Sequence, residues 1–201
     1  MESLVIEQTV QFREICETYR PKILRYLTRL VGQAEAEDIT QDVLIKVGKS
    51  LPQFRGDSGL NTWIYRIVTN SAIDSLRKRS ASQTQGSGCV ETDEESDSLF
   101  GQEPDRMEES APSVEAGMIR TEMNRCIQEF VARLPEDYRI VMVLSEMEGF
   151  SNAEIADIIG VSLDTVKIRL HRARQKLRQE LSAGCNFHRD EHNEFACDRK
   201  S

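Results

Sequence analysis

The sequence has few of the residues that build catalytic sites and membrane spans. It contains three histidines, one tryptophan and 6% aromatic residues in a chain of 201 residues. One histidine, His171, lies in a basic segment and the other two lie near the C-terminus, and no glycine-rich phosphate loop or nucleophile motif is present. No apolar run approaches the roughly 18 residues that a bilayer span needs. We therefore expect a protein that is neither an enzyme nor a membrane protein.

Cysteine is also scarce and irregularly placed. The five cysteines are an odd number at irregular spacings, which disfavours a secreted disulfide framework. The N-terminal segment MESLVIEQTVQFREICETY carries acids where a secretory signal has bases, and it lacks a long apolar core. These features predict a cytoplasmic protein in which most thiols are reduced.

The charge is unevenly distributed along the chain. The net charge is −8, yet residues 80–115 alone hold ten acids and one base, Arg106. Residues 163–178 hold six bases and a single acid, Asp164. The average charge therefore hides a basic stripe of the kind that binds nucleic acid.

Composition and periodicity predict the architecture. Residues 81–115 are rich in Ser, Gly, Gln and Glu and poor in large apolar residues, so they cannot offset the entropy of ordering. The flanking segments show helical periodicity, and no convincing strand pattern is present. We predict an all-α fold of two small helical domains, residues 1–80 and 116–182, joined by a flexible acidic linker at 81–115. A tail follows at 183–201.

The first domain is predicted to hold three helices. Apolar residues recur at helical spacing through residues 12–30, where Pro21 marks a kink or a break. A second helix runs over about 35–51; Gly48 within it costs about 1 kcal/mol relative to Ala, so packing must override propensity there. One side of this helix carries a polar cluster: Glu37, Asp38, Gln41 and Asp42. The cluster is either a solvated face or a docking surface for a basic partner.

The third predicted helix begins near Leu60 and interleaves aromatic with cationic and amide side chains. Trp63 and Tyr65 stand beside Arg66 and Asn70. Such a mixture suits unpaired bases, which stack on rings and are read on their exposed edges. The alternative is that the aromatic residues belong to the core.

The second domain is predicted to end in a helix-turn-helix. Ser151 and Glu154 form a capping box, Gly160 turns the chain and Ser162 caps the last helix. The inward stripe of that helix would be Leu163, Val166, Leu170, Ala173 and Leu177. The side chains left for bases and phosphates include Thr165, Lys167, Ile168, Arg169 and Arg172. A solvated cationic helix is the alternative.

The tail contains four residues that bind zinc in other proteins. Cys185, His188, His192 and Cys197 lie within thirteen residues, and the two histidines are four apart, on one face if the tail is helical. A metal there would supply the folding energy that so short a segment lacks. A reversible Cys185–Cys197 disulfide and a plain solvated tail are the alternatives. No cofactor is required elsewhere in the chain.

Three segments in this order resemble the extracytoplasmic-function (ECF) sigma factors of bacteria. They are AEDITQDVLIKV, LNTWIYRIVTNSAIDSLRKR and, after a variable linker, LPEDYRIVMVLSEMEGFSNAEIADIIGVSLDTVKIRLHRARQKL. The resemblance covers roughly residues 8–182. Ordinary helix-turn-helix regulators resemble only the last segment.

The resemblance implies a non-enzymatic subunit that binds core RNA polymerase and promoter DNA and is monomeric when free. Residues 1–80 would be region 2 and residues 116–182 region 4. The polymerase contact falls on the polar cluster Glu37, Asp38, Gln41 and Asp42, facing a basic-rimmed coiled coil. The minus-10 element would be captured and melted by Trp63, Arg66, Asn70, Asp74, Arg77 and Lys78. The minus-35 element would be read by Thr165, Lys167, Ile168, Arg169 and Arg172. The sequence does not decide whether an anti-sigma protein is a third partner.

Two positions depart from the family pattern. Ile168 stands where many relatives have a small polar residue; it either touches a thymine methyl group or packs inward. Gly48 stands where relatives often carry a large residue. The glycine would loosen the docking helix. The alternative function is a stand-alone helix-turn-helix regulator with a metal- or thiol-sensing tail.

Overall fold

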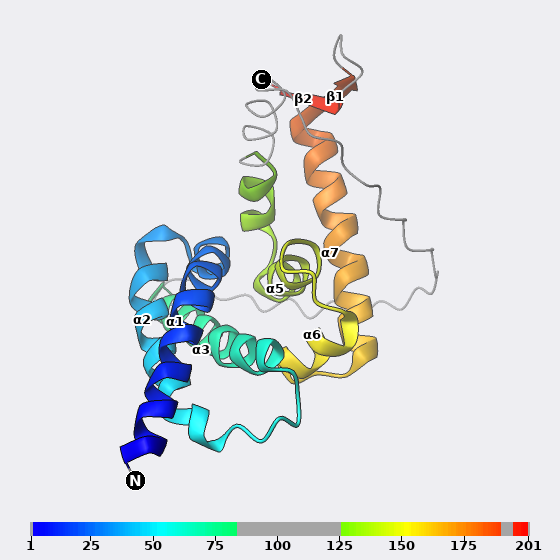
Figure 1. Cartoon of the computed structure of the whole chain (residues 1–201). Coiled ribbons are helices and arrows are strands. Elements are labelled where there is room, and N and C mark those ends of the chain that lie inside the picture. The colour runs from blue at the N-terminus through cyan, green and yellow to red at the C-terminus, as the bar shows by residue number, and fades with distance from the viewer. Residues whose placement is uncertain (1, 84–125, 190–194, 201) are drawn as a thin grey trace.

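The computed structural model describes residues 2–83, 126–189 and 195–200. The predicted linker at 81–115 lies outside these residues, except for positions 81–83. The predicted start of the second domain, 116–125, and His192 of the tail also lie outside them. Figure 1 shows two groups of helices side by side, α1 to α3 and α5 to α7, with a strand pair at the far end of α7.

The N-terminal domain consists of three helices and a short 3-10 turn: α1 (Glu2–Val31), α2 (Gln33–Ser50), η1 (Leu51–Gln53) and α3 (Leu60–Gln83). Of the kink or break predicted at Pro21, the break does not occur: α1 continues through this residue. The apolar faces of the three helices meet in a core that excludes water. Its fully buried members include Ile23, Leu27, Leu30, Val43, Val47, Ile64 and Val68.

Gly48 lets α2 approach α1 closely. A Cβ atom at this position would lie 2.9 Å from the ring of Phe12, a distance that real Cβ contacts essentially never show. The space that a side chain at position 48 would occupy is therefore filled by the aromatic ring of Phe12 from α1. Packing compensates for the low helix propensity of glycine, as the sequence predicted.

The C-terminal domain contains a helical segment over residues 126–133, then α5 (Glu136–Met142), a π-helical turn η2 (Val143–Met147), α6 (Asn152–Ile159) and α7 (Leu163–Gly184). The predicted caps are confirmed. Ser151 and Glu154 form a capping box, and the Ser162 hydroxyl accepts a hydrogen bond from the backbone N–H of Thr165. Gly160 has φ of 70°, in the left-handed region that favours glycine.

One member of the predicted inward stripe of α7 was misplaced. Val166, Leu170 and Ala173 are buried and Leu177 is half-buried, but Leu163 is 41% exposed. Leu163 is the first residue of the helix, so less of the domain covers it than covers the residues one turn later.

The tail forms a β-hairpin, although no strand pattern was predicted. Strand β1 (Cys185–Arg189) pairs antiparallel with β2 (Phe195–Arg199) in the register Cys185 with Arg199 and Phe187 with Cys197. An isolated pair of strands is only marginally stable in water. This short hairpin therefore depends on the helices against which it packs. The rest of the all-α prediction is confirmed.

The two helical domains share one continuous hydrophobic core. Helix α3 packs against α6, and α1 contacts α5. The core cluster accordingly runs from α1–α3 residues such as Tyr65 and Val68 into Val143, Phe150 and Ile155 of the second domain. Among the helices of the described residues, none has an apolar stretch of the length and purity that crossing a membrane requires.

Gly160 offers a test of the helix-turn-helix turn. Gly160→Ala should lower the free energy of unfolding by about 1 kcal/mol, because an L-residue is strained at positive φ. Gly160→Asn should cost less, since Asn tolerates the left-handed region. Urea denaturation of both variants measures the difference, and equal stability of Ala and Asn variants would contradict the assigned turn.

Candidate nucleic-acid and docking surfaces

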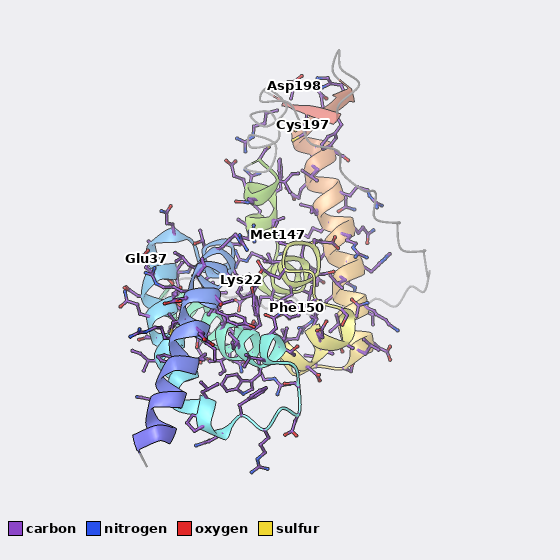
Figure 2. All side chains as sticks on the ribbon, in the orientation of Figure 1. Lys22, Glu37, Met147, Phe150, Cys197 and Asp198 are labelled. Atoms are coloured by element: carbon purple, nitrogen blue, oxygen red, sulfur yellow. The ribbon has the colours of Figure 1, made fainter. Side chains whose placement is uncertain are left out.

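The predicted acidic cluster lies on the outer face of α2. Glu37, Asp38, Gln41 and Asp42 are all exposed, while Ala36, Thr40 and Val43 on the opposite side of the helix are buried. Figure 2 shows Glu37 on the side of α2 that points away from the C-terminal domain. The four polar side chains thus form a single accessible surface.

The structure adds Ile45 to this surface. Ile45 follows Gln41 by one helical turn and is 54% exposed. Ile45 was not predicted as part of this surface, although its position one helical turn after Gln41 places it on the same side of the helix. The exposed surface of α2 therefore combines carboxylate and amide groups with one apolar side chain.

The predicted minus-10 residues form a stripe on α3. Arg66, Asn70, Asp74, Arg77 and Lys78 are exposed, and the first four follow each other at steps of four, four and three residues, so they share one face. Trp63 is half-buried, with its ring 5.0 Å from that of Phe54. One edge of the stripe therefore presents an aromatic ring beside cationic and amide groups.

Tyr65 does not belong to this stripe. Its side chain is buried, in edge-to-face contact with Tyr26 at 5.2 Å and Phe150 at 4.8 Å. Burial, together with the hydrogen bond to Glu148, raises the pKa of the Tyr65 phenol far above its usual range. Tyr65 is therefore a core residue that acts as a permanent hydrogen-bond donor, and the base-stacking interpretation is withdrawn for it.

Glu148 of the second domain binds two residues of the first. Its carboxylate accepts hydrogen bonds from Arg29 at 2.9 Å and from the Tyr65 hydroxyl at 2.6 Å. The Glu148 side chain is only 6% exposed and that of Arg29 18% exposed. We name these three residues the interdomain triad. Figure 2 shows Phe150, two residues further along the chain, between α3 and the C-terminal helices.

A predicted DNA-binding residue, Arg66, also takes part in this interface. The Nε–H of Arg66 donates a hydrogen bond to the backbone carbonyl of Asp157 in α6, at 2.7 Å. This contact uses the guanidinium group of the minus-10 stripe to hold the first helix of the helix-turn-helix. In this arrangement Arg66 cannot also bind a base or phosphate through Nε.

The exposed face of α7 carries the predicted minus-35 residues. Lys167 and Ile168 are exposed, whereas Thr165, Arg169 and Arg172 are half-buried. Ile168 is 53% exposed, so it does not pack inward and is available to a thymine methyl group. Arg169 forms an ion pair of 2.7 Å with Asp137 at the start of α5, so its guanidinium group is held between α7 and α5.

Of the predicted metal ligands, the three that the structure describes are not brought together. In the hairpin, Cys185 and Cys197 occupy one face, and His188 occupies the other, where its Nδ1 lies 3.6 Å from Asp198. The prediction assumed helical spacing, and alternation along a strand separates the ligands instead. His192 lies outside the described residues, and within those residues no group of three His, Cys, Asp or Glu is arranged to hold a metal ion.

Two parts of the chain match known protein families. Residues 15–82 match Sigma-70 region 2, and residues 124–177 match Sigma-70, region 4. The ECF RNA polymerase sigma factor SigW of Bacillus subtilis is 32% identical over 171 residues, covering 85% of this chain and 88% of the relative. The RNA polymerase sigma-H factor of Pseudomonas aeruginosa is 35% identical over 164 residues, covering 81% and 82%.

Solved structures share the fold. The sigma factor RpoE of Bartonella quintana, in complex with the anti-sigma factor NepR, superposes with a TM-score of 0.62 at 23% identity, covering 86% of this chain and 97% of that one. CnrH, in complex with the cytosolic domain of CnrY, gives 0.59 at 22% identity, covering 87% and 90%.

The interdomain triad can be tested in solution. Arg29→Met leaves the buried Glu148 carboxylate without its cation, so opening the interface to water becomes more favourable by about 2 kcal/mol, a roughly 30-fold shift. Small-angle scattering should show a larger radius of gyration for Arg29→Met than for the wild type. Arg174→Met is the matched control, because its partner Glu146 is about half exposed and already hydrated. Equal radii for all three proteins would contradict the triad's role.

Proposed function

The chain belongs to the extracytoplasmic-function sigma factors of the sigma-70 family, and from this membership we propose how its surfaces divide the work of an alternative sigma factor. Residues 1–80 act as region 2, which docks on core RNA polymerase and captures the minus-10 element. Residues 116–182 act as region 4, which reads the minus-35 element, and residues 81–115 act as the linker. The chain contributes no catalytic step and acts in the cytoplasm, with the polymerase performing all chemistry.

The observation that carries this proposal is the placement of the polar surfaces. The stripe on α3 and the exposed face of α7 lie in the segments that match region 2 and region 4, respectively. In the alternative, a stand-alone helix-turn-helix regulator, the first domain would receive a signal or form a dimer. The region 2 match accounts for that domain without a separate signal.

We assign polymerase docking to Glu37, Asp38, Gln41 and Asp42, with Ile45 as an added apolar contact. Exposed carboxylates attract a basic partner and speed its association, while a neighbouring apolar side chain loses its hydration on contact. We propose an anti-sigma protein as a further partner of the chain, since the solved relative RpoE is bound to one.

We assign minus-10 capture to the stripe on α3. Trp63 would stack on an unpaired base, and Asn70 would bond to a base edge. Arg66, Arg77 and Lys78 would neutralise phosphates, and Asp74 completes the stripe. Capturing bases outside the duplex favours the melted state, which is how binding alone helps to open DNA.

Reading both promoter elements requires the two domains to separate. The minus-35 and minus-10 elements lie roughly 25 base pairs apart, or about 85 Å at 3.4 Å per base pair. In this structure Arg66 of the minus-10 stripe bonds directly to Asp157 of the helix-turn-helix. We propose that this structure is the closed form of the free protein, and that docking on the polymerase supplies the free energy for opening.

The docking surface can be tested by run-off transcription with purified core polymerase and promoter fragments. Asp38→Arg reverses a charge at the centre of the acidic cluster and should reduce both core binding and transcript yield by about tenfold or more. Glu17→Arg makes the same charge change on the exposed side of α1 and should leave both near the wild-type level. Wild-type yield from Asp38→Arg would refute this docking site.

The minus-35 assignment can be tested with a library of randomised minus-35 sequences. Ile168→Ser removes the apolar contact, so the preference for thymine at one position should fall by about threefold or more. Gln175→Ser, two turns further along the exposed side of α7, should keep the wild-type preference. An unchanged preference in Ile168→Ser would remove Ile168 from the reading set.

A further inference from the structure

The hairpin contacts the helical segment 126–133 through one ion pair, and the end of α7 packs against the same segment. Arg199 of β2 forms an ion pair with Glu129. Gly184, at the end of α7, lies so close to Phe130 that a Cβ atom would be 2.6 Å from the ring. Lys200 adds a backbone hydrogen bond to the carbonyl of Gly184 at 2.9 Å. The hairpin therefore has a defined position against this helix.

These contacts bring Cys126 close to the hairpin that contains Cys185 and Cys197. Cys126 precedes Glu129 and Phe130 by three and four residues, so all three side chains share one face of the helix. Arg199, the partner of Glu129, is paired in the sheet with Cys185. Cys126 therefore faces the Cys185 end of the hairpin.

Two further thiols lie near Cys185. Cys185 is buried, and the half-buried Cys126 and Cys197 are close enough to it to raise its pKa. Cys185 and Cys197 lie on the same face of the strand pair. Figure 2 shows Cys197 at the far end of α7, well away from Phe150. We name Cys126, Cys185 and Cys197 the thiol cluster.

We propose that the thiol cluster is a reversible oxidation site in which Cys126 and Cys185 form a disulfide bond. Hydrogen peroxide oxidises the half-buried Cys126 thiol to a sulfenic acid, and one water molecule leaves. The Cys185 thiol then attacks the Cys126 sulfur, forming the S–S bond and releasing a second water molecule. Two thiols are oxidised and one peroxide is reduced, so the step balances.

A disulfide fits the cluster better than a metal ion does. The described residues contain no group of three ligands arranged for a metal, whereas a disulfide needs only two neighbouring cysteines whose Cβ atoms can come within about 4 Å of each other. The bond would join the helix that begins the described part of the C-terminal domain to the segment that follows α7. It would thus close most of that domain into a covalent loop, which reduces the entropy of its unfolded state.

The surroundings of the cluster make its oxidation depend on pH. Burial raises the pKa of the Cys185 thiol and of the Cys197 thiol, and the neighbouring Cys126 acts in the same direction. Asp198 raises the pKa of Cys197 further, while the nearby Glu129 carboxylate is paired with Arg199. Because the thiolate is the nucleophile, disulfide formation should be slow at neutral pH and accelerate as the pH rises.

The product can be identified by peptide mapping of the oxidised full-length protein. Purified reduced chain is treated with hydrogen peroxide, alkylated, digested without reductant and analysed by mass spectrometry. A peptide pair linked through Cys126 and Cys185 is expected, and it should be absent from Cys126→Ser but present in Cys16→Ser. Alkylated Cys126 and Cys185 after complete oxidation of Cys16, or a Cys185–Cys197 link alone, would overturn the proposal.

A second measurement follows the physical effect of the bond. Oxidation should raise the midpoint of thermal unfolding of the wild type by about 5 °C or more, and dithiothreitol should reverse the shift. Cys126→Ser should show no such shift, and the wild-type rate of oxidation should increase between pH 7 and pH 9. A wild-type midpoint that does not respond to oxidation would contradict the covalent loop even if a link were detected.

Discussion

The closed arrangement of the two domains depends on a carboxylate buried between them. Glu148 is nearly inaccessible to water, so its charge requires the guanidinium group of Arg29 and the hydroxyl group of Tyr65. Both partners come from the N-terminal domain, and neither domain alone can satisfy the group. Around this triad the apolar surfaces of α3 and α6 come together, and Arg66 is brought within hydrogen-bond distance of α6.

This dependence links the packing of the protein to its function as a sigma factor. The side chain that closes the interface from α3, Arg66, is one that we assign to promoter capture, and Arg169 of the recognition helix is likewise held by Asp137. Contacts of this kind are exchangeable, because a phosphate oxygen replaces a carbonyl or a carboxylate as acceptor for the same guanidinium group. In the closed form that we propose for the free protein, Arg66 and Arg169 stay paired in this way until DNA offers alternative acceptors.

The C-terminal tail shows how strongly an interpretation of spacing depends on the assumed secondary structure. On a helix, residues four apart share a face, so His188 and His192 pointed to one metal site together with Cys185 and Cys197. In a strand, neighbouring residues alternate, and His188 is placed opposite the two cysteines. The third thiol, Cys126, comes from a helix 59 residues earlier in the chain than Cys185, a proximity that no local pattern contains.

The sequence by itself determined the features that follow from short-range geometry. The capping box at Ser151, the left-handed turn at Gly160, the exposed acidic side of α2 and the exposed stripe on α3 all follow from residue type and helical period. Only the tertiary structure decided which partner each exposed or buried group has. Tyr65 in the core, Phe12 over Gly48, Glu148 between the domains and the thiol cluster all depend on contacts between distant segments. Such contacts arise because several elements must bury their apolar faces together, and the periodicity of one element does not specify which neighbour covers it.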